Sequence, residues 1–126
     1  MIVGGYAVGI HGHPRYTGDL DIWLLPEPAN AANIIKAIKD FGFGSLDIKE
    51  SDLTKEDGVI QFGYPPLRID LLSGIDGVHF NDCYPNMKII NIDGLGIDFI
   101  GYADLIKNKK ASGRHQDLGD IDNLKE

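Results

Sequence analysis

Three aspartates are the residues of this chain whose types and spacing best fit catalytic chemistry. Asp19 and Asp21 open the apolar run Asp-Leu-Asp-Ile-Trp-Leu-Leu, and Asp70 lies inside a second run, Ile-Asp-Leu-Leu. Ionised carboxylates are unfavourable in such surroundings unless a cation meets them. Side chains alternate between the two faces of a strand, so Asp19 and Asp21 point to the same side. If the second run is a neighbouring strand, Asp70 reaches the same place, and three converging carboxylates suit a hard divalent cation such as Mg²⁺.

A solvated strand face is the simpler explanation for two acids that are spaced by one residue. The apolar residues around Asp19 and Asp21 argue against it, because they occupy both faces of the expected strand, as in a central strand. Asp70 repeats the pattern, since it also stands between two apolar residues. The joint occurrence of the three acids favours a functional site.

The hydrophobic pattern and the turn residues predict alternating strands and helices. Pro28 is expected near the start of a helix, and Asp93-Gly94 is a strong two-residue hairpin signal. These elements predict an α/β (α+β) fold, with a mixed, mostly antiparallel sheet of four to six strands and helices mainly on one face. The expected strands cover residues 2–3, 19–25, 59–63, 67–72, 87–92 and 95–100. The expected helices cover 6–11, 31–41 and 102–111, with a further helix from 116 and a short one near 51. The pattern over 79–86 is ambiguous in its secondary structure.

The length and composition describe one domain over residues 1–126. Hydrophobic residues make up 43% and charged residues 25% of the chain, which is typical of a soluble globular protein. No apolar run is long enough to cross a membrane, and no signal peptide is evident. One cysteine, Cys83, excludes an internal disulfide and fits a cytoplasmic location. A net charge of −7 favours a small substrate, or one end of a larger one, over an extended nucleic-acid surface.

A glycine pair precedes the acids along the chain. Gly4-Gly5 follows a short strand, and lack of a Cβ lets a phosphate approach the backbone there, although a plain turn is the simpler explanation. Thirteen residues separate Gly5 from Asp19, and the strand with Asp70 comes later. In this order of motifs the chain resembles the nucleotidyltransferase superfamily whose best-known fold relative is DNA polymerase β.

The resemblance extends over nearly the whole chain. The segments Val-Gly-Gly-Tyr-Ala-Val, Thr-Gly-Asp-Leu-Asp and the closing Gly-Arg-His-Gln-Asp-Leu-Gly-Asp-Ile are similar to small bacterial nucleotidyltransferases related to the abortive-infection toxin group. Two features depart from that group. Many relatives have Ser where this chain has Gly5, and many carry a further domain, so the acceptor substrate stays open.

The resemblance implies roles for further residues. Gly4, Gly5 and Thr17 would bind the nucleotide, and Lys109 would face its triphosphate. Arg15, with Thr17 on the loop before the acids, would contact phosphate or acceptor, or else stabilise the loop. Arg114 would contact phosphate or acceptor, or form an ion pair with Asp117 that braces the last helices.

The function implied is that of a minimal metal-dependent nucleotidyltransferase, which moves an NMP from an NTP to an acceptor hydroxyl and releases pyrophosphate. Asp19, Asp21 and Asp70 would be both metal ligands and catalytic residues for two Mg²⁺ ions, with Mn²⁺ as a substitute. An RNA end, a protein hydroxyl and a small alcohol all remain open as acceptors. The alternative is a catalytically weak nucleotide-binding protein or a toxin–antitoxin partner. The chain opens almost inside its first strand, so a shortened N-terminus, a homodimer or a partner subunit is also expected.

Overall fold

The computed structural model describes residues 1–44, 46–64 and 66–125, and within them one sheet organises the chain. Its six strands lie in the order β3-β4-β2-β1-β6-β5. Three neighbouring pairs are antiparallel, whereas β2–β4 and β1–β6 are parallel. The mixed, mostly antiparallel sheet is therefore confirmed. The strands are β1 (Ile2–Val3), β2 (Asp19–Trp23), β3 (Val59–Tyr64), β4 (Leu67–Leu72), β5 (Lys88–Ile92) and β6 (Leu95–Phe99).

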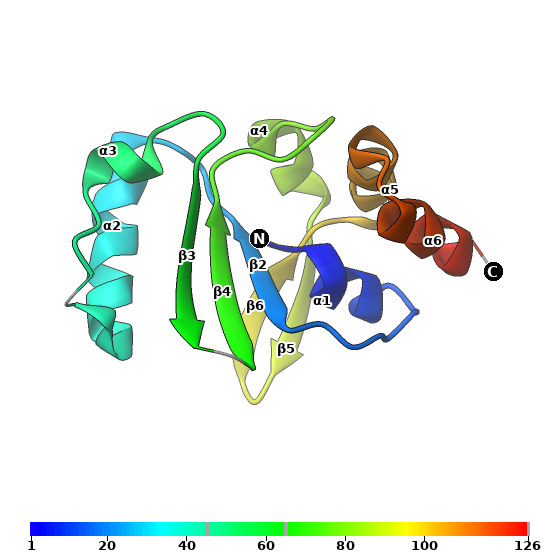
Figure 1. Cartoon of the computed structure of the whole chain (residues 1–126), viewed down its shortest axis with the longest axis horizontal. Coiled ribbons are helices and arrows are strands. Elements are labelled where there is room, and N and C mark those ends of the chain that lie inside the picture. The colour runs from blue at the N-terminus through cyan, green and yellow to red at the C-terminus, as the bar shows by residue number, and fades with distance from the viewer. Residues whose placement is uncertain (45, 65, 126) are drawn as a thin grey trace.

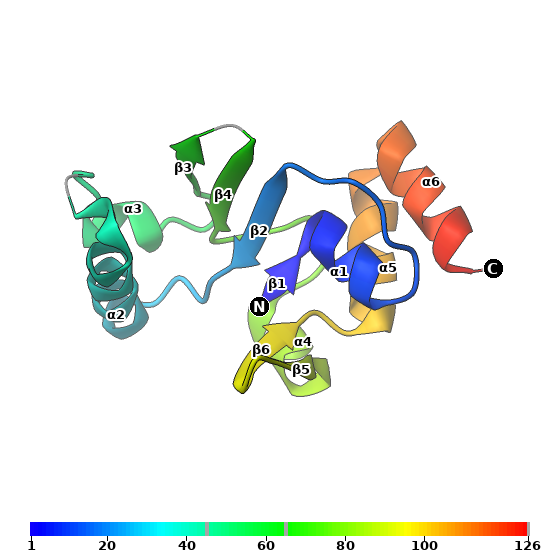
Figure 2. The same ribbon diagram turned by 90° about the horizontal axis from the view of Figure 1, so that it is seen from below.

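Helices cover both faces of the sheet. The larger helical group is α1 (Gly4–Ile10), α4 (Phe80–Cys83), α5 (Tyr102–Ser112) and α6 (His115–Leu124); the smaller is α2 (Pro28–Ile38) and α3 (Glu50–Leu53). Figure 1 shows α2 and α3 beside β3, and Figure 2 shows them across the sheet from α1, α5 and α6. The expected main helical layer is present, and α2 and α3 add a second layer on the other face.

Two hydrophobic clusters follow from the alternation of side chains along β2 and β4. On one face Trp23 packs with helices of the larger group through residues such as Leu105. On the other face Leu71 packs with Ala31 of α2 and Leu53 of α3. A strand that is apolar on both faces must be central, and β2 and β4 are both interior strands of the sheet.

Local sequence signals account for several boundaries. Pro28 is the first residue of α2, as its fixed φ angle favours. Asp93 and Gly94 both have positive φ, at 52° and 82°, which is the backbone of the expected tight hairpin turn between β5 and β6. The ambiguous segment 79–86 forms α4 and then a 3₁₀ turn at Tyr84–Asn86. The expected strand over 19–25 ends earlier, at Trp23.

Candidate active site

The pairing of β2 with β4 brings the three aspartates together. The strands run parallel in a register that sets Asp21 directly beside Asp70, and Asp19 lies two residues earlier on the same face of β2. All three residues line one open cleft of about 740 Å³. We call Asp19, Asp21 and Asp70 the carboxylate trio. The three carboxylates therefore lie in one cleft, as the sequence predicts, and a shared ion there stays a prediction.

Arg68 is the cation that meets two of these carboxylates. Its Nη2 donates to Asp19 Oδ2 at 2.9 Å, and its Nε donates to Asp70 Oδ1 at 3.1 Å. The sequence interpretation assigned no role to Arg68. Two signals pointed to it: it precedes Asp70 by two residues, hence shares its face, and a semi-buried carboxylate needs a cationic partner.

Asp21 carries the least compensated charge of the trio. Its pKa is raised to about 6, first by burial and then by repulsion from Asp70 and Asp19, while Lys109 acts in the opposite direction. The guanidinium of Arg68 pairs with Asp19 and Asp70 but not with Asp21. Burial and the two neighbouring carboxylates therefore both disfavour the charged form of Asp21.

A divalent cation would supply the missing charge. Carboxylate oxygens are the donors that Mg²⁺ prefers, so the trio fits such an ion in chemical type. Among residues 1–44, 46–64 and 66–125, however, no group of three or more His, Cys, Asp or Glu side chains is arranged as a ready metal site. Arg68 gives a physical reason, because its guanidinium stands between Asp19 and Asp70 and holds their oxygens.

The glycine pair lies at the junction of β1 and α1, against the trio. Gly4 has a φ of +67°, and a Cβ there would collide with the carboxylate of Asp21. A Cβ on Gly5 would come within 3.0 Å of Thr17. The absence of a Cβ thus lets Asp21 and Thr17 pack closely against this backbone, and both glycines line the cleft. The Thr17 hydroxyl donates to the carbonyl of Asp19 at 3.3 Å, so Thr17 stabilises the loop before β2.

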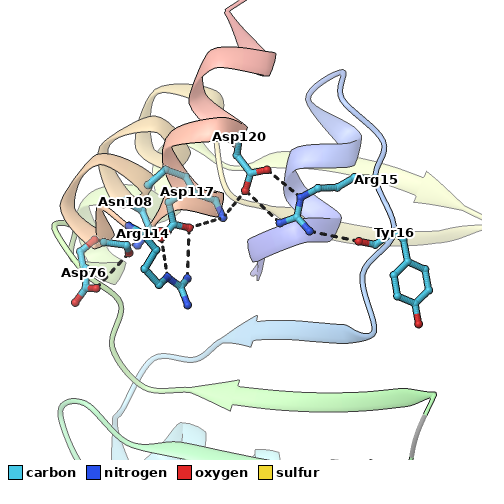
Figure 3. A network of polar contacts seen from close by, with 9 residues as sticks. Arg15, Tyr16, Asp76, Asn108, Arg114, Asp117 and Asp120 are labelled. Carbon is cyan, nitrogen blue, oxygen red and sulfur yellow. Dashed lines mark hydrogen bonds and ion pairs between the residues drawn. The ribbon is translucent and has the colours of Figure 1, made fainter.

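A network of cations borders the cleft on its helical side (Figure 3). Arg15 forks onto Asp120, with Nε and Nη2 at 2.9 and 3.1 Å from its oxygens. Lys109 Nζ lies 3.1 Å from both Asp117 Oδ1 and Asp120 Oδ2, and Arg114 Nε donates to Asp117 Oδ2 at 2.7 Å. We call these five residues the cation network. Three cations share two buried carboxylates, so its formal charge is +1.

The expected cations lie at the cleft, but each of them already forms an ion pair with an aspartate. Lys109 lines the cleft, yet its side chain is only 6% exposed and its ammonium is bound by two carboxylates rather than free to meet a phosphate. Arg15 is bound to Asp120. Arg114 forms an ion pair with Asp117, which is one of the two roles expected for it from the sequence. The Arg114 side chain is 75% exposed, so its guanidinium still reaches the cleft.

Two other reactive residue types take structural roles. His11 Nε2 lies 2.7 Å from the carbonyl oxygen of Ile100 and packs edge-on against Tyr102. Cys83 is buried, and burial together with nearby Asp104 raises the pKa of its thiol to about 12. A thiol with so high a pKa is a poor nucleophile at neutral pH.

Comparison with known proteins found no match that points to a function. No known protein family has a sequence model that matches the chain, and no curated protein matches it at a significant level. In the part of the chain that the structure describes, no helix combines the length and the apolar character that crossing a membrane requires.

Proposed function

We propose that the protein is a metal-dependent nucleotidyltransferase, which moves an NMP from an NTP to an acceptor hydroxyl and releases pyrophosphate. One observation carries the proposal: strands far apart in sequence set Asp19, Asp21 and Asp70 in one cleft, beside a glycine pair. Phosphoryl transfer needs little more from a protein than positioned charge and an open backbone near the phosphates.

In this proposal the acidic residues bind the metal ions, and the glycine pair and Arg114 contact the phosphates. Asp19 and Asp21 would hold the nucleotide-bound ion, and all three members of the trio would hold a second ion. Mg²⁺, or Mn²⁺ in its place, would neutralise phosphate charge and lower the pKa of the acceptor hydroxyl. The backbone at Gly4 and Gly5, which lines the cleft, would receive the phosphates, and exposed Arg114 would face them from the cation network.

Asp70 is the proposed general base. As the acceptor oxygen bonds to the α-phosphorus, the bond from that phosphorus to the β-phosphate oxygen breaks and pyrophosphate leaves. The hydroxyl proton passes to the Asp70 carboxylate. Asp70 is buried in the interior strand β4, so the packing around it limits the orientations open to its carboxylate.

A first test measures Mg²⁺-dependent binding of each NTP to the wild-type chain, followed by incubation with labelled NTPs in lysate to find the labelled acceptor. With that acceptor, Asp70→Ala is expected to slow pyrophosphate release by at least about a hundredfold. Asp40→Ala is the matched control, because Asp40 is exposed and pairs with Lys36 on α2, across the sheet. Unchanged turnover in Asp70→Ala would remove the proposed base.

A nucleotide-binding protein without turnover, such as a toxin–antitoxin partner, is the second candidate. The occupation of Lys109 by Asp117 and Asp120 favours it, because a lysine so paired contributes little to a transition state. Metal-dependent NTP binding without pyrophosphate release in any lysate fraction, together with a stable co-purifying partner, would select this candidate.

A further inference from the structure

Arg68 occupies the space between the carboxylates that a metal ion needs. In the β2–β4 register Arg68 is the neighbour of Asp19, and it precedes Asp70 on the same face of β4. A third contact, from Nη2 to Asp70 Oδ2 at 3.4 Å, adds to the two shorter ones. One planar guanidinium thus bridges both strands and presents donors to three carboxylate oxygens.

A guanidinium and a divalent cation compete for the same lone pairs. An oxygen that accepts a hydrogen bond from Arg68 has fewer lone pairs directed at an ion, and two positive groups repel each other at such short range. Arg68 also balances only part of the charge, since it pairs with Asp19 and Asp70 but not with Asp21, which lies directly beside Asp70. A divalent cation among the three carboxylates would carry more charge than this single guanidinium does.

Arg68 is able to leave this position. Its side chain is 43% exposed, as is that of Asp19, so this ion pair is worth little in water. The Asp70 side chain is 10% exposed, so the pair with Asp70 is the stronger of the two. The long aliphatic stem allows the charged end to turn into the cleft while β4 stays in place.

We propose that Arg68 is a displaceable counter-ion: it bridges Asp19 and Asp70 in the metal-free protein and gives up both carboxylates when a divalent cation binds the trio. The inference rests on the proposed function, because it takes the trio to be the metal site. Arg68 is then a positioning residue that opposes metal binding. A permanent brace would do the reverse and promote metal binding by holding the carboxylates in place.

The sign of one affinity change separates these two roles. Mn²⁺ binding to the full chain at pH 7.5 and low salt is measured by electron paramagnetic resonance and calorimetry. We expect Arg68→Gln to bind Mn²⁺ about tenfold more tightly than wild type, as the loss of two partly exposed ion pairs implies. Arg68→Lys should fall between them, because an ammonium cannot bridge two carboxylates as a planar fork does.

The control is Lys36→Gln, which removes the same charge from an exposed site on α2, on the far face of the sheet. Its Mn²⁺ affinity should equal that of wild type. Thermal melting without metal checks that each variant is folded, and added Mn²⁺ should raise the melting temperature of Arg68→Gln more than that of wild type.

Equal or weaker Mn²⁺ binding by both Arg68 variants, with binding by wild type intact, would overturn the counter-ion role and leave the proposed function standing. Absence of Mn²⁺ binding by every folded variant would instead overturn the proposed function itself, and this inference with it.

Discussion

Asp21 makes the metal-free protein sensitive to pH. In the unfolded chain its carboxyl takes the ordinary value of 3.8, whereas in the fold its pKa is about 6. Between these two values the folded state binds its proton more tightly than the unfolded state does. The contribution of Asp21 to the free energy of unfolding therefore falls as pH rises through this window, and the penalty is complete above pH 6.

Asp21→Asn removes that penalty. At pH 7.5 without metal, we expect the variant to be more stable than wild type by roughly 1 kcal/mol, after discounting for solvent screening. At pH 3.5 the difference should nearly vanish, because Asp21 is then neutral in the folded wild type and mostly protonated in the unfolded chain. Urea unfolding at the two pH values measures this, with Asp40→Asn as the exposed control. A wild type that is the more stable protein at pH 7.5 would contradict the assignment.

The junction of β1 and α1 depends on a glycine at one position. Gly4→Ala forces a side chain into the left-handed region and against Asp21, so we expect a loss of roughly 2 kcal/mol in unfolding free energy. Gly119→Ala in α6 is the matched control, because a Cβ there meets nothing within 4 Å. The control should be neutral or gain up to about 1 kcal/mol. Equal effects of the two substitutions in urea unfolding would show that the Gly4 conformation carries no special requirement.

The helices α5 and α6 are held together by the buried part of the cation network. Burial opposes ionisation of Asp117, but hydrogen bonds from Arg114 and Lys109 outweigh it and keep its pKa below the ordinary value. Its stabilising effect is therefore present above the unfolded pKa and is lost as pH falls through the folded pKa.

Asp117→Asn leaves Lys109 buried with one partner fewer. We expect a loss of about 3 kcal/mol at pH 7.5, shrinking in strong acid, whereas Arg114→Gln, which changes an exposed side chain, should cost less than about 1 kcal/mol. Thermal and urea unfolding of both variants measure the difference. Similar losses in the two would mean that the exposed half of the network carries the stability.

At the scale of the whole molecule, an anionic protein is proposed to bind an anionic nucleotide. The net charge is −7, and the trio faces the same cleft that would take the phosphates. The cation network offers a formal +1 in return, which is too little to offset the trio and a triphosphate. In the proposed function, a divalent cation would then be needed for nucleotide binding as well as for the chemical step.

Chelation should therefore weaken NTP binding by at least about tenfold. Calorimetric titration with each NTP, in Mg²⁺ and in EDTA at constant ionic strength, measures the effect. Full affinity in EDTA would mean that the phosphates avoid the trio altogether. A titration in Ca²⁺ serves as the control, because Ca²⁺ supplies the same charge as Mg²⁺ but is larger and less strict in its coordination geometry.

The parts of the fold and of the candidate site that could be predicted from the sequence are those set by local interactions. Pro28 marks a helix start and Asp93-Gly94 a hairpin because each acts on its own backbone, and the shared face of Asp19 and Asp21 follows from strand geometry alone. Arg68 and Asp19 are 49 residues apart, so their contact exists only once β2 and β4 have paired.

The expected role of Lys109 shows a second limit of prediction from the sequence. A lysine near a cleft is attractive for phosphate, but the i and i+3 spacing of Asp117 and Asp120 sets two carboxylates on one face of α6, where they hold its ammonium. The spacing of these two acids is visible in the sequence, but the lysine that they hold comes from a different helix, α5.

The strand that carries Asp70 has its reverse side bound into the second hydrophobic cluster, through Leu71. In the proposed enzyme, the position of the Asp70 carboxylate would thus depend on how closely Leu71 packs against α2 and α3. Shortening Leu71 to valine or alanine would loosen that packing and shift Asp70 without removing any polar group. Substitutions at a remote apolar contact could in this way change the rate of the proposed reaction while its polar residues stay the same.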